Sequence, residues 1–154
     1  MNKKQCGFSF LTTFLMLIAI ATAALGYSIY KKSEEKSAKL KQTQEINQAR
    51  TTIKATMVKY QDAIQLAAST SRIALSGPVS NMQGLKREAD LIIVPACMSK
   101  SKEFLIQGMN ASIQHFLDFM QQKSSSTEQE ESAKNIKAYF DNASEAQDLC
   151  NKLL

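Results

Sequence analysis

Apolar side chains recur at helical spacing along the middle of the chain. Neither proline nor glycine occurs between Lys31 and Leu75, so no breaker interrupts a helix there. One set of positions in this stretch alternates in steps of four and three residues, which is typical of one helix face: Ile53, Met57, Tyr60, Ile64, Ala67, Ser71 and Ala74. The pattern predicts a long helix over residues 31–75 with a heptad-like, coiled-coil stripe.

A second and shorter helix is predicted after Gly77-Pro78. Because proline is tolerated in the first turn of a helix, this pair ends the long helix and begins the next one. The residue before a proline is disfavoured in the helical region, so Val94-Pro95 ends the second helix near Ile93.

A third helix is predicted from Cys97 or Met98 to Gln122. Its apolar side is formed by Leu105, Met109, Ile113, Phe116 and Met120. The polar residues 124–132 then form a turn, in which the serines or Thr127 cap a fourth helix.

The fourth helix begins with acidic residues, which favour the positive end of a helix dipole: Glu128, Glu130 and Glu131. Its apolar positions follow the same helical spacing: Ile136, Tyr139, Phe140, Ala143, Ala146, Cys150 and Leu153. The whole pattern predicts an all-α fold, with a bundle of three to four helices.

Two cysteines are placed to join the last two helices. The midpoint between Cys97 and Cys150 falls at the edge of the polar turn, so an antiparallel hairpin folded there brings both cysteines to one end. A disulfide requires Cα atoms within about 7 Å. We expect a Cys97–Cys150 disulfide that closes a loop of roughly 50 residues and contributes about 4 kcal/mol in the chain-entropy model. The alternative is that both are buried, reduced side chains.

The N-terminal residues 1–30 predict a membrane anchor or a secretory signal. The run from Phe8 to Tyr30 is apolar except for small or hydroxyl residues, and it is long enough to cross a bilayer. Small residues over 21–24 suit signal cleavage. Interfacial tyrosines followed by Lys31-Lys32 favour an uncleaved anchor, which is our preferred interpretation.

A third interpretation of the same segment is a type IV pilin leader. Residues 3–8 resemble a prepilin cleavage site, with the cut after Gly7 and a long helix following. Pilins carry a glutamate where this chain has Thr12, and the C-terminal part lacks the alternation of a β-sheet.

Two signals conflict over the side of the membrane on which residues 31–154 lie. Two lysines precede the apolar run and five follow it by Lys41, so the positive-inside rule places the domain in the cytoplasm. A persistent disulfide requires an oxidising compartment. We follow the cysteines and expect a single-pass protein of a bacterial inner membrane with its C-terminal domain in the periplasm or outside the cell. Cys6 then remains on the inner side.

The positive charge is concentrated next to the apolar run. The net charge is +5, and residues 31–60 alone carry eight basic against three acidic residues, whereas residues 61–154 carry nine against eleven. Basic residues in that position suit anionic lipid head groups. A nucleic-acid-binding domain would carry its excess in the folded part, so no nucleic-acid partner is expected.

Catalytic, cofactor and metal signatures are not found in the sequence. His115 is the only histidine, and Asp118 is the one carboxylate at helical spacing from it, so we interpret it as a structural side chain. No Glu-x-x-His pair exists for a di-iron centre. We expect no enzymatic activity, no cofactor and no metal. Lys86 and Arg87 lie on a mixed-charge face that is a candidate rim for a partner.

Residues 72–120 carry a run of short motifs: Arg-Ile-Ala-Leu before a proline, Val-Pro-x-Cys, and a helix ending in Phe-Leu-x-Phe-Met. The run resembles small, uncharacterised bacterial helical proteins that are exported or membrane-anchored. The resemblance implies export and a helical bundle, and no activity. Cys6 follows Lys-Lys-Gln, which departs from the lipidation box of lipoproteins.

The expected function is therefore binding at the cell envelope, as a membrane-anchored interaction or structural module. Besides the lipid bilayer, its partner is a second copy or another envelope protein, with contact through the stripe from Ile53 to Ala74. The sequence identifies no small-molecule ligand. The alternatives are a periplasmic ligand-sensing four-helix domain and a pilin-like filament subunit.

Overall fold

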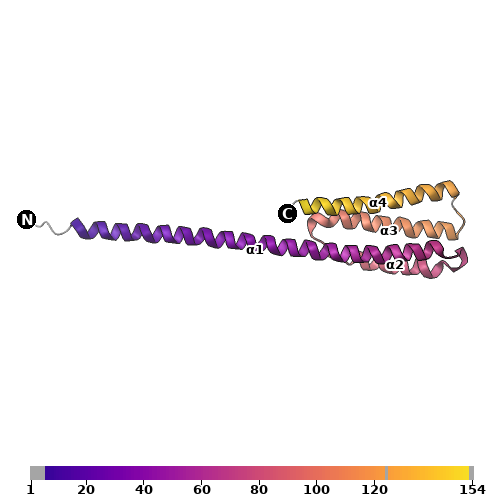
Figure 1. Cartoon of the computed structure of the whole chain (residues 1–154), viewed down its shortest axis with the longest axis horizontal. Coiled ribbons are helices and arrows are strands. Elements are labelled where there is room, and N and C mark those ends of the chain that lie inside the picture. The colour runs from indigo at the N-terminus through magenta and orange to yellow at the C-terminus, as the bar shows by residue number, and fades with distance from the viewer. Residues whose placement is uncertain (1–5, 124, 153–154) are drawn as a thin grey trace, which may run out of the picture. The chain divides into compact units, whose positions relative to one another are not determined.

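All secondary structure in the described part of the chain is helical, as predicted. The computed structural model describes the backbone of residues 6–123 and 125–152, and the side chains of residues 27, 30–123, 125–150 and 152. The elements in chain order are α1 (Cys6–Ser69), the single turn η1 (Arg72–Ala74), α2 (Ser76–Asp90), the single turn η2 (Ala96–Met98), α3 (Ser99–Met120) and α4 (Ser126–Lys152) (Figure 1).

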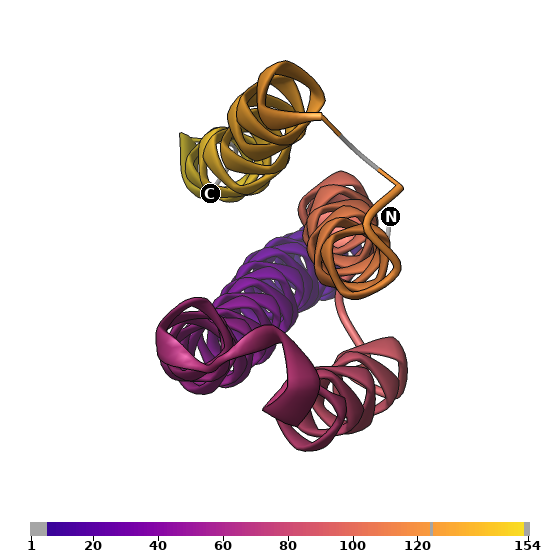
Figure 2. The same cartoon turned by 90° about the vertical axis from the view of Figure 1, so that its right-hand side faces the viewer.

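The chain divides into two compact units, Met1–Gln42 and Thr43–Leu154. In the first unit, α1 presents Tyr27, Tyr30 and Leu40 with more than 60% of each side chain exposed. In the second unit, residues 43–69 of α1 pack with the other three helices into a four-helix bundle. Figure 2 looks along this bundle and shows α3 between α2 and α4.

Where placement is described, no helix combines the length and the apolar character needed to cross a membrane. The predicted membrane segment covers residues 8–30. Of its side chains, only those of Tyr27 and Tyr30 are described, and the others lie outside the described residues. Cys6 lies outside them in the same way. The anchor therefore stays a prediction from the sequence.

The first helix ends earlier than predicted, at Ser69 instead of Leu75. The hydroxyl groups of Ser69 and Thr70 both donate to the carbonyl of Leu66, at 3.0 and 2.6 Å. The Thr70 N–H bonds the carbonyl of Ala67, so these hydroxyl groups satisfy a Leu66 carbonyl that the end of the helix leaves without its helical partner. The Gly77-Pro78 pair lies in the first turn of α2, as expected. It does not end α1, which has already ended at Ser69.

The second helix also ends earlier than predicted, at Asp90 instead of Ile93. Lys102 of α3 donates from Nζ to the carbonyls of Asp90 and Ile92, at 2.7 Å each. A helix leaves its last carbonyls without internal partners, and a lysine there satisfies them and complements the dipole. The following loop presents Leu91 and Ile93, which are 81% and 93% exposed.

One core joins the four helices of the second unit. The predicted apolar side of α3 is confirmed, since Leu105, Met109, Ile113 and Phe116 are all buried. Tyr60 is fully buried and donates its hydroxyl to the carbonyl of Met109 at 2.8 Å. Burial raises the pKa of Tyr60 above its ordinary value, although a hydrogen bond with Ser112 opposes this shift.

Small residues on α3 allow α4 to approach closely. A Cβ atom added at Gly108 would lie 3.1 Å from the ring of Phe140 and 3.2 Å from Cβ of Tyr139. Further along, the buried hydroxyl of Ser101 donates to the carbonyl of Ala143 at 2.8 Å. These two contacts set the separation of the hairpin helices.

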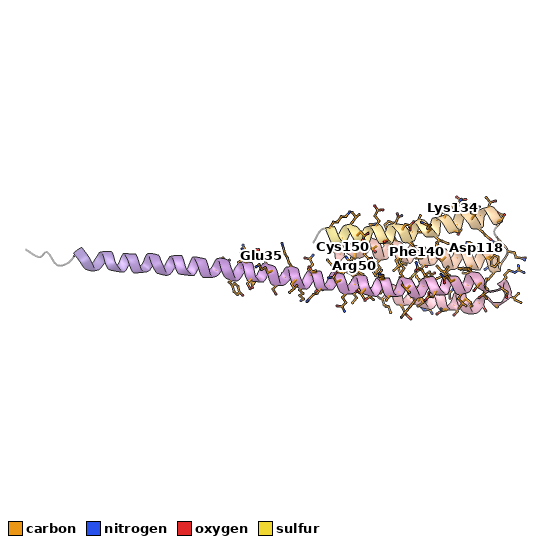
Figure 3. The ribbon with its side chains drawn as sticks, in the orientation of Figure 1. Glu35, Arg50, Asp118, Lys134, Phe140 and Cys150 are labelled. Atoms are coloured by element: carbon orange, nitrogen blue, oxygen red, sulfur yellow. A yellow bond between two sulfur atoms is a disulfide. The ribbon has the colours of Figure 1, made fainter. Side chains whose placement is uncertain are left out.

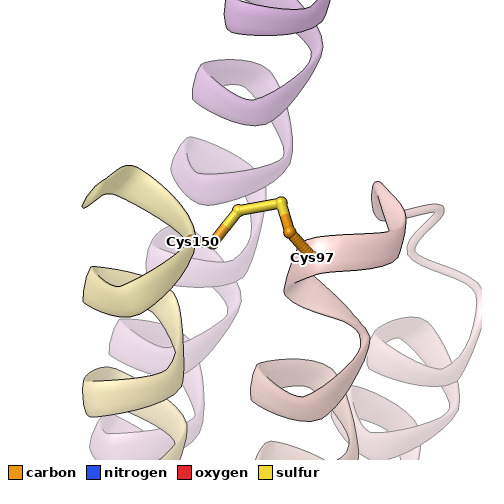
Figure 4. The surroundings of a disulfide bond; sticks show 2 residues. All are labelled: Cys97 and Cys150. Atoms are coloured by element: carbon orange, nitrogen blue, oxygen red, sulfur yellow. A yellow bond between two sulfur atoms is a disulfide. The ribbon is translucent and has the colours of Figure 1, made fainter. Parts of the chain in front are cut away.

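The predicted disulfide is present, and it joins Cys97 of η2 to Cys150 near the end of α4 (Figure 4). The two Cα atoms are 5.3 Å apart, within the range that a disulfide requires. Because α3 and α4 run antiparallel, cysteines 53 positions apart meet at one end of the hairpin.

Candidate ligand groove

A groove of about 710 Å³ lies between α1, α3 and α4. It occupies the end of the bundle away from the disulfide; Figure 3 places Phe140 and Asp118 on that side and Cys150 on the other. The lining residues are Gln61, Ile64, Ala67, Ala68, Thr70, Ser112, His115, Phe116, Phe119, Gln129, Ala133, Ile136, Lys137, Phe140 and Asp141.

The walls of the groove are mainly apolar. Phe116 and Phe119 of α3 and Phe140 of α4 supply three aromatic rings, and aliphatic side chains of α1 and α4 complete the lining. The Phe140 ring packs over Gly108 and lies 6.2 Å from the ring of the buried Tyr60, measured between centroids. This wall is therefore held in place by the core behind it.

The polar lining combines uncharged groups with His115 and an exposed ion pair. Lys137 and Asp141 form an ion pair at 2.6 Å within one turn of α4. Ser112 is buried and donates to the carbonyl of Gly108 at 2.8 Å. Gln61 of α1 adds an amide group, and Thr70, just after α1, adds a hydroxyl group that donates to the Leu66 carbonyl.

The groove exists because α4 is fully packed only towards its C-terminal end. Ala143 and Cys150 are its buried positions in the described part of the chain. The other apolar positions predicted from the spacing, Ile136, Tyr139, Phe140 and Ala146, are half-buried. The close contact at Gly108 fixes α4 against α3, while the first turns of α4 leave space beside α1.

The turn before α4 contains the cap of this helix. Ser125 and Glu128 form a reciprocal cap: Glu128 accepts from the Ser125 backbone at 2.7 Å and from its hydroxyl at 2.9 Å, and its own N–H reaches the Ser125 hydroxyl at 3.4 Å. The backbone bond first, and the hydroxyl bond second, lower the pKa of Glu128. A serine cap was predicted and is confirmed.

His115 borders the groove from α3. It is half-buried, as the sequence suggested, and its ring meets that of Phe116 edge-on, with centroids 5.4 Å apart. A second hollow of about 380 Å³, lined also by Asp118 and Glu131, lies on its other side. Among the described residues no three histidine, cysteine, aspartate or glutamate side chains gather as metal ligands would.

The predicted interface stripe lies mostly in the core of its own chain. Ile53, Tyr60 and Ala67 are buried, and Met57 and Ile64 are half-buried against the same core. Ser71 and Ala74 are exposed beyond the end of α1. Contact between two copies through the buried positions would therefore require the bundle to open.

The predicted charge rim lies on α2, outside the groove. Lys86 pairs with Asp90 at 2.9 Å, and Arg87 is exposed. Neither Lys86 nor Arg87 lines the groove.

Comparisons with known proteins add no assignment. No protein-family model matches the chain, and no significant match is found among curated proteins or solved structures. The functional argument therefore rests on the groove and the residues that form it.

The sequence did not reveal the groove, although most of its walls were recognised as apolar helix positions. Ile64, Phe116, Ile136 and Phe140 had all been placed on apolar helix faces. A helical stripe indicates which face turns inward but does not indicate how far apart two helices lie. Three apolar lining residues lay outside those stripes: Ala68, Ala133 and Phe119, the last of which is 37% exposed.

Proposed function

We propose that this protein is a membrane-anchored binding module of the bacterial cell envelope, without enzymatic activity. The N-terminal apolar run would hold it in the inner membrane, and the bundle would lie in the periplasm or outside the cell. The Cys97–Cys150 pairing supports this location, because such bonds persist in oxidising compartments.

The groove between α1, α3 and α4 is the single observation that carries the binding role. Its volume of about 710 Å³ falls within the range of about 300–1,000 Å³ that is common for ligand sites. Apolar walls with a few polar groups are the usual composition of such sites. A protein partner, either a second copy or another envelope protein, would contact the exposed face of α2 that carries Arg87 and would not use the groove.

The ligand-sensing four-helix domain is the second candidate, and the same groove favours it. Sensing additionally requires a change that passes from the groove to another element or partner. The pilin-like alternative has a simple test, since cleavage after Gly7 would appear in the N-terminal mass of the mature protein.

Topology is tested by periplasmic and cytoplasmic reporter fusions after Lys152. We expect activity only from the periplasmic reporter, and protection of Cys97 and Cys150 from alkylation until a reductant is added. Activity of the cytoplasmic reporter alone would overturn the proposed location.

The binding role is tested on the full chain in lipid nanodiscs with isotope-labelled alanine methyl groups. Naphthalene-based probes should shift the signals of Ala67, Ala68 and Ala133, which line the groove, and leave Ala138 unchanged. An Ala133→Phe substitution should abolish the shifts, whereas Ala138→Phe, on the same helix but outside the groove, should not. Equal shifts at Ala138, or none at the groove alanines, would refute the role.

A further inference from the structure

Two aliphatic side chains protrude from the loop between α2 and α3. Leu91 is 81% exposed and Ile93 is 93% exposed. Ile92 and Val94, which alternate with them, pack against the core. Lys102 of α3 holds the start of the loop through its two hydrogen bonds to backbone carbonyls. Because the loop is fixed from behind, the fold itself sets the outward position of Leu91 and Ile93.

A hollow of about 530 Å³ lies directly beside these side chains, and we call it the loop hollow. Residues 91–95 form one wall, and Glu45, Gln48, Ala49 and Thr52 of α1 form the other. Large aliphatic side chains that are exposed together indicate an interaction site. The loop therefore supplies both a protrusion and part of a hollow at the same level of the bundle.

Opposite charges accompany the protrusion and the hollow. Glu45, which borders the hollow, is exposed. Arg87 is exposed four residues before Leu91, whose backbone is still helical, so both side chains lie on the same side of α2. Neither Glu45 nor Arg87 forms an ion pair with another residue in the described part of the chain. Each charge is thus available to a partner.

These features make the loop surface complementary to itself. In a two-fold contact the same patch faces itself, so each protrusion must meet a hollow and each charge its opposite. The loop surface supplies both members of both pairs. It is small beside the about 20–30 residues that each partner of a stable interface contributes. Anchors in one membrane would offset this, because they confine two chains together and raise their effective concentration.

We propose that two copies of this chain associate through a two-fold contact, in which Leu91 and Ile93 of each copy enter the loop hollow of the other. Arg87 of each copy then pairs with Glu45 of the other. The inference rests on the proposed anchor and on the proposed partner face of α2. It goes beyond them because it identifies the partner as a second copy and names both contacting surfaces, and it is independent of the groove.

The test uses full chains that carry a donor or an acceptor dye on Cys6, the cysteine outside the disulfide, in liposomes at varied protein-to-lipid ratios. We expect energy transfer above the random level. Ile93→Asp should raise the ratio at half-maximal transfer at least about tenfold, because it brings a carboxylate into an apolar contact. Ile73→Asp is the matched control, since Ile73 is 90% exposed in η1 at the other end of the bundle. It should change that ratio by less than about twofold.

A charge exchange tests which surfaces face each other. Arg87→Glu and Glu45→Arg should each weaken association at least about threefold, because each places like charges opposite one another. The chain with both substitutions should return to within about twofold of wild type, since the pair is restored with its charges exchanged. Circular dichroism of every variant checks that the bundle is folded.

The outcomes separate this inference from the proposed function. Energy transfer at the random level would overturn the two-fold contact, while the groove stays subject to its own alanine test. Transfer that Ile93→Asp leaves unchanged, or a double charge exchange as weak as the single ones, would show that these surfaces do not face each other and would also overturn it. Chains that fail to float with the liposomes would refute the proposed anchor, and the inference with it.

Discussion

At the scale of single residues, two glycines inside helices have opposite surroundings. Gly84 of α2 has only Arg87 Nη2 within reach of an added Cβ atom, at 3.9 Å, whereas Gly108 of α3 lies against Phe140 and Tyr139. Glycine inside a helix costs about 0.5–1 kcal/mol relative to alanine. The two sites therefore separate backbone propensity from packing.

We expect Gly84→Ala to raise the free energy of unfolding by about 0.5–1 kcal/mol. Gly108→Ala should lower it by about 1 kcal/mol, because overpacking of about 1–3 kcal/mol exceeds the gain in helix propensity. Urea denaturation followed by circular dichroism measures both. Equal stabilisation by the two substitutions would show that α4 can move away from residue 108 without loss of stability.

Tyr60 gives a second prediction at this scale. Tyr60→Phe removes a buried hydrogen bond to the Met109 carbonyl, which keeps its helical partner within α3, so the free energy of unfolding should fall by about 0.5–1.5 kcal/mol. Tyr139→Phe is the matched control, because Tyr139 is only half-buried and should change stability by less than about 0.5 kcal/mol. A similar change in both variants would contradict the role of the hydroxyl.

At the scale of elements, helix positions followed from the sequence because their signals are local. Spacing located the buried faces of α1 and α3, and Pro95 marked the region where α2 had already ended. The early end of α1 was missed, because neither proline nor glycine marks it and the apolar spacing continues past Ser69 to Ala74. The half-buried face of α4 depends on its distance from α1, which is a tertiary property.

The cap of α4 makes the stability of this element dependent on pH. The pKa of Glu128 is lowered from 4.5 by the bonds from Ser125. Its stabilising contribution is thus present above the unfolded value and is lost as the pH falls through the lower folded value. The stability difference between wild type and Glu128→Gln should therefore shrink as the pH falls below the ordinary value of 4.5, as measured by urea denaturation. Glu131→Gln, on the same exposed first turns of α4 but outside the cap, is the matched control.

At the scale of the whole molecule, the disulfide adds a covalent restraint to a helix that already packs extensively on α3. The first half of α4 is half-exposed beside the groove, and its contacts with α3 include Gly108 and the hydrogen bond from Ser101. A loop closed over 53 positions contributes about 4 kcal/mol in the chain-entropy model. Such a contribution is a large part of the stability of about 5–15 kcal/mol that is usual for a domain.

Reduction, or a double Cys97→Ser and Cys150→Ser substitution, should therefore lower the free energy of unfolding by about 4 kcal/mol. It should also release α4 before the rest of the bundle, so that amide hydrogens of residues 126–150 exchange faster than those buried in α3. Denaturation with hydrogen exchange by mass spectrometry measures both effects. A Cys6→Ser chain is the control and should match wild type, since Cys6 takes no part in the bond. If reduction leaves the exchange of α4 unchanged, noncovalent packing on α3 is sufficient to hold the helix, and the groove would then keep its shape in a reducing compartment as well.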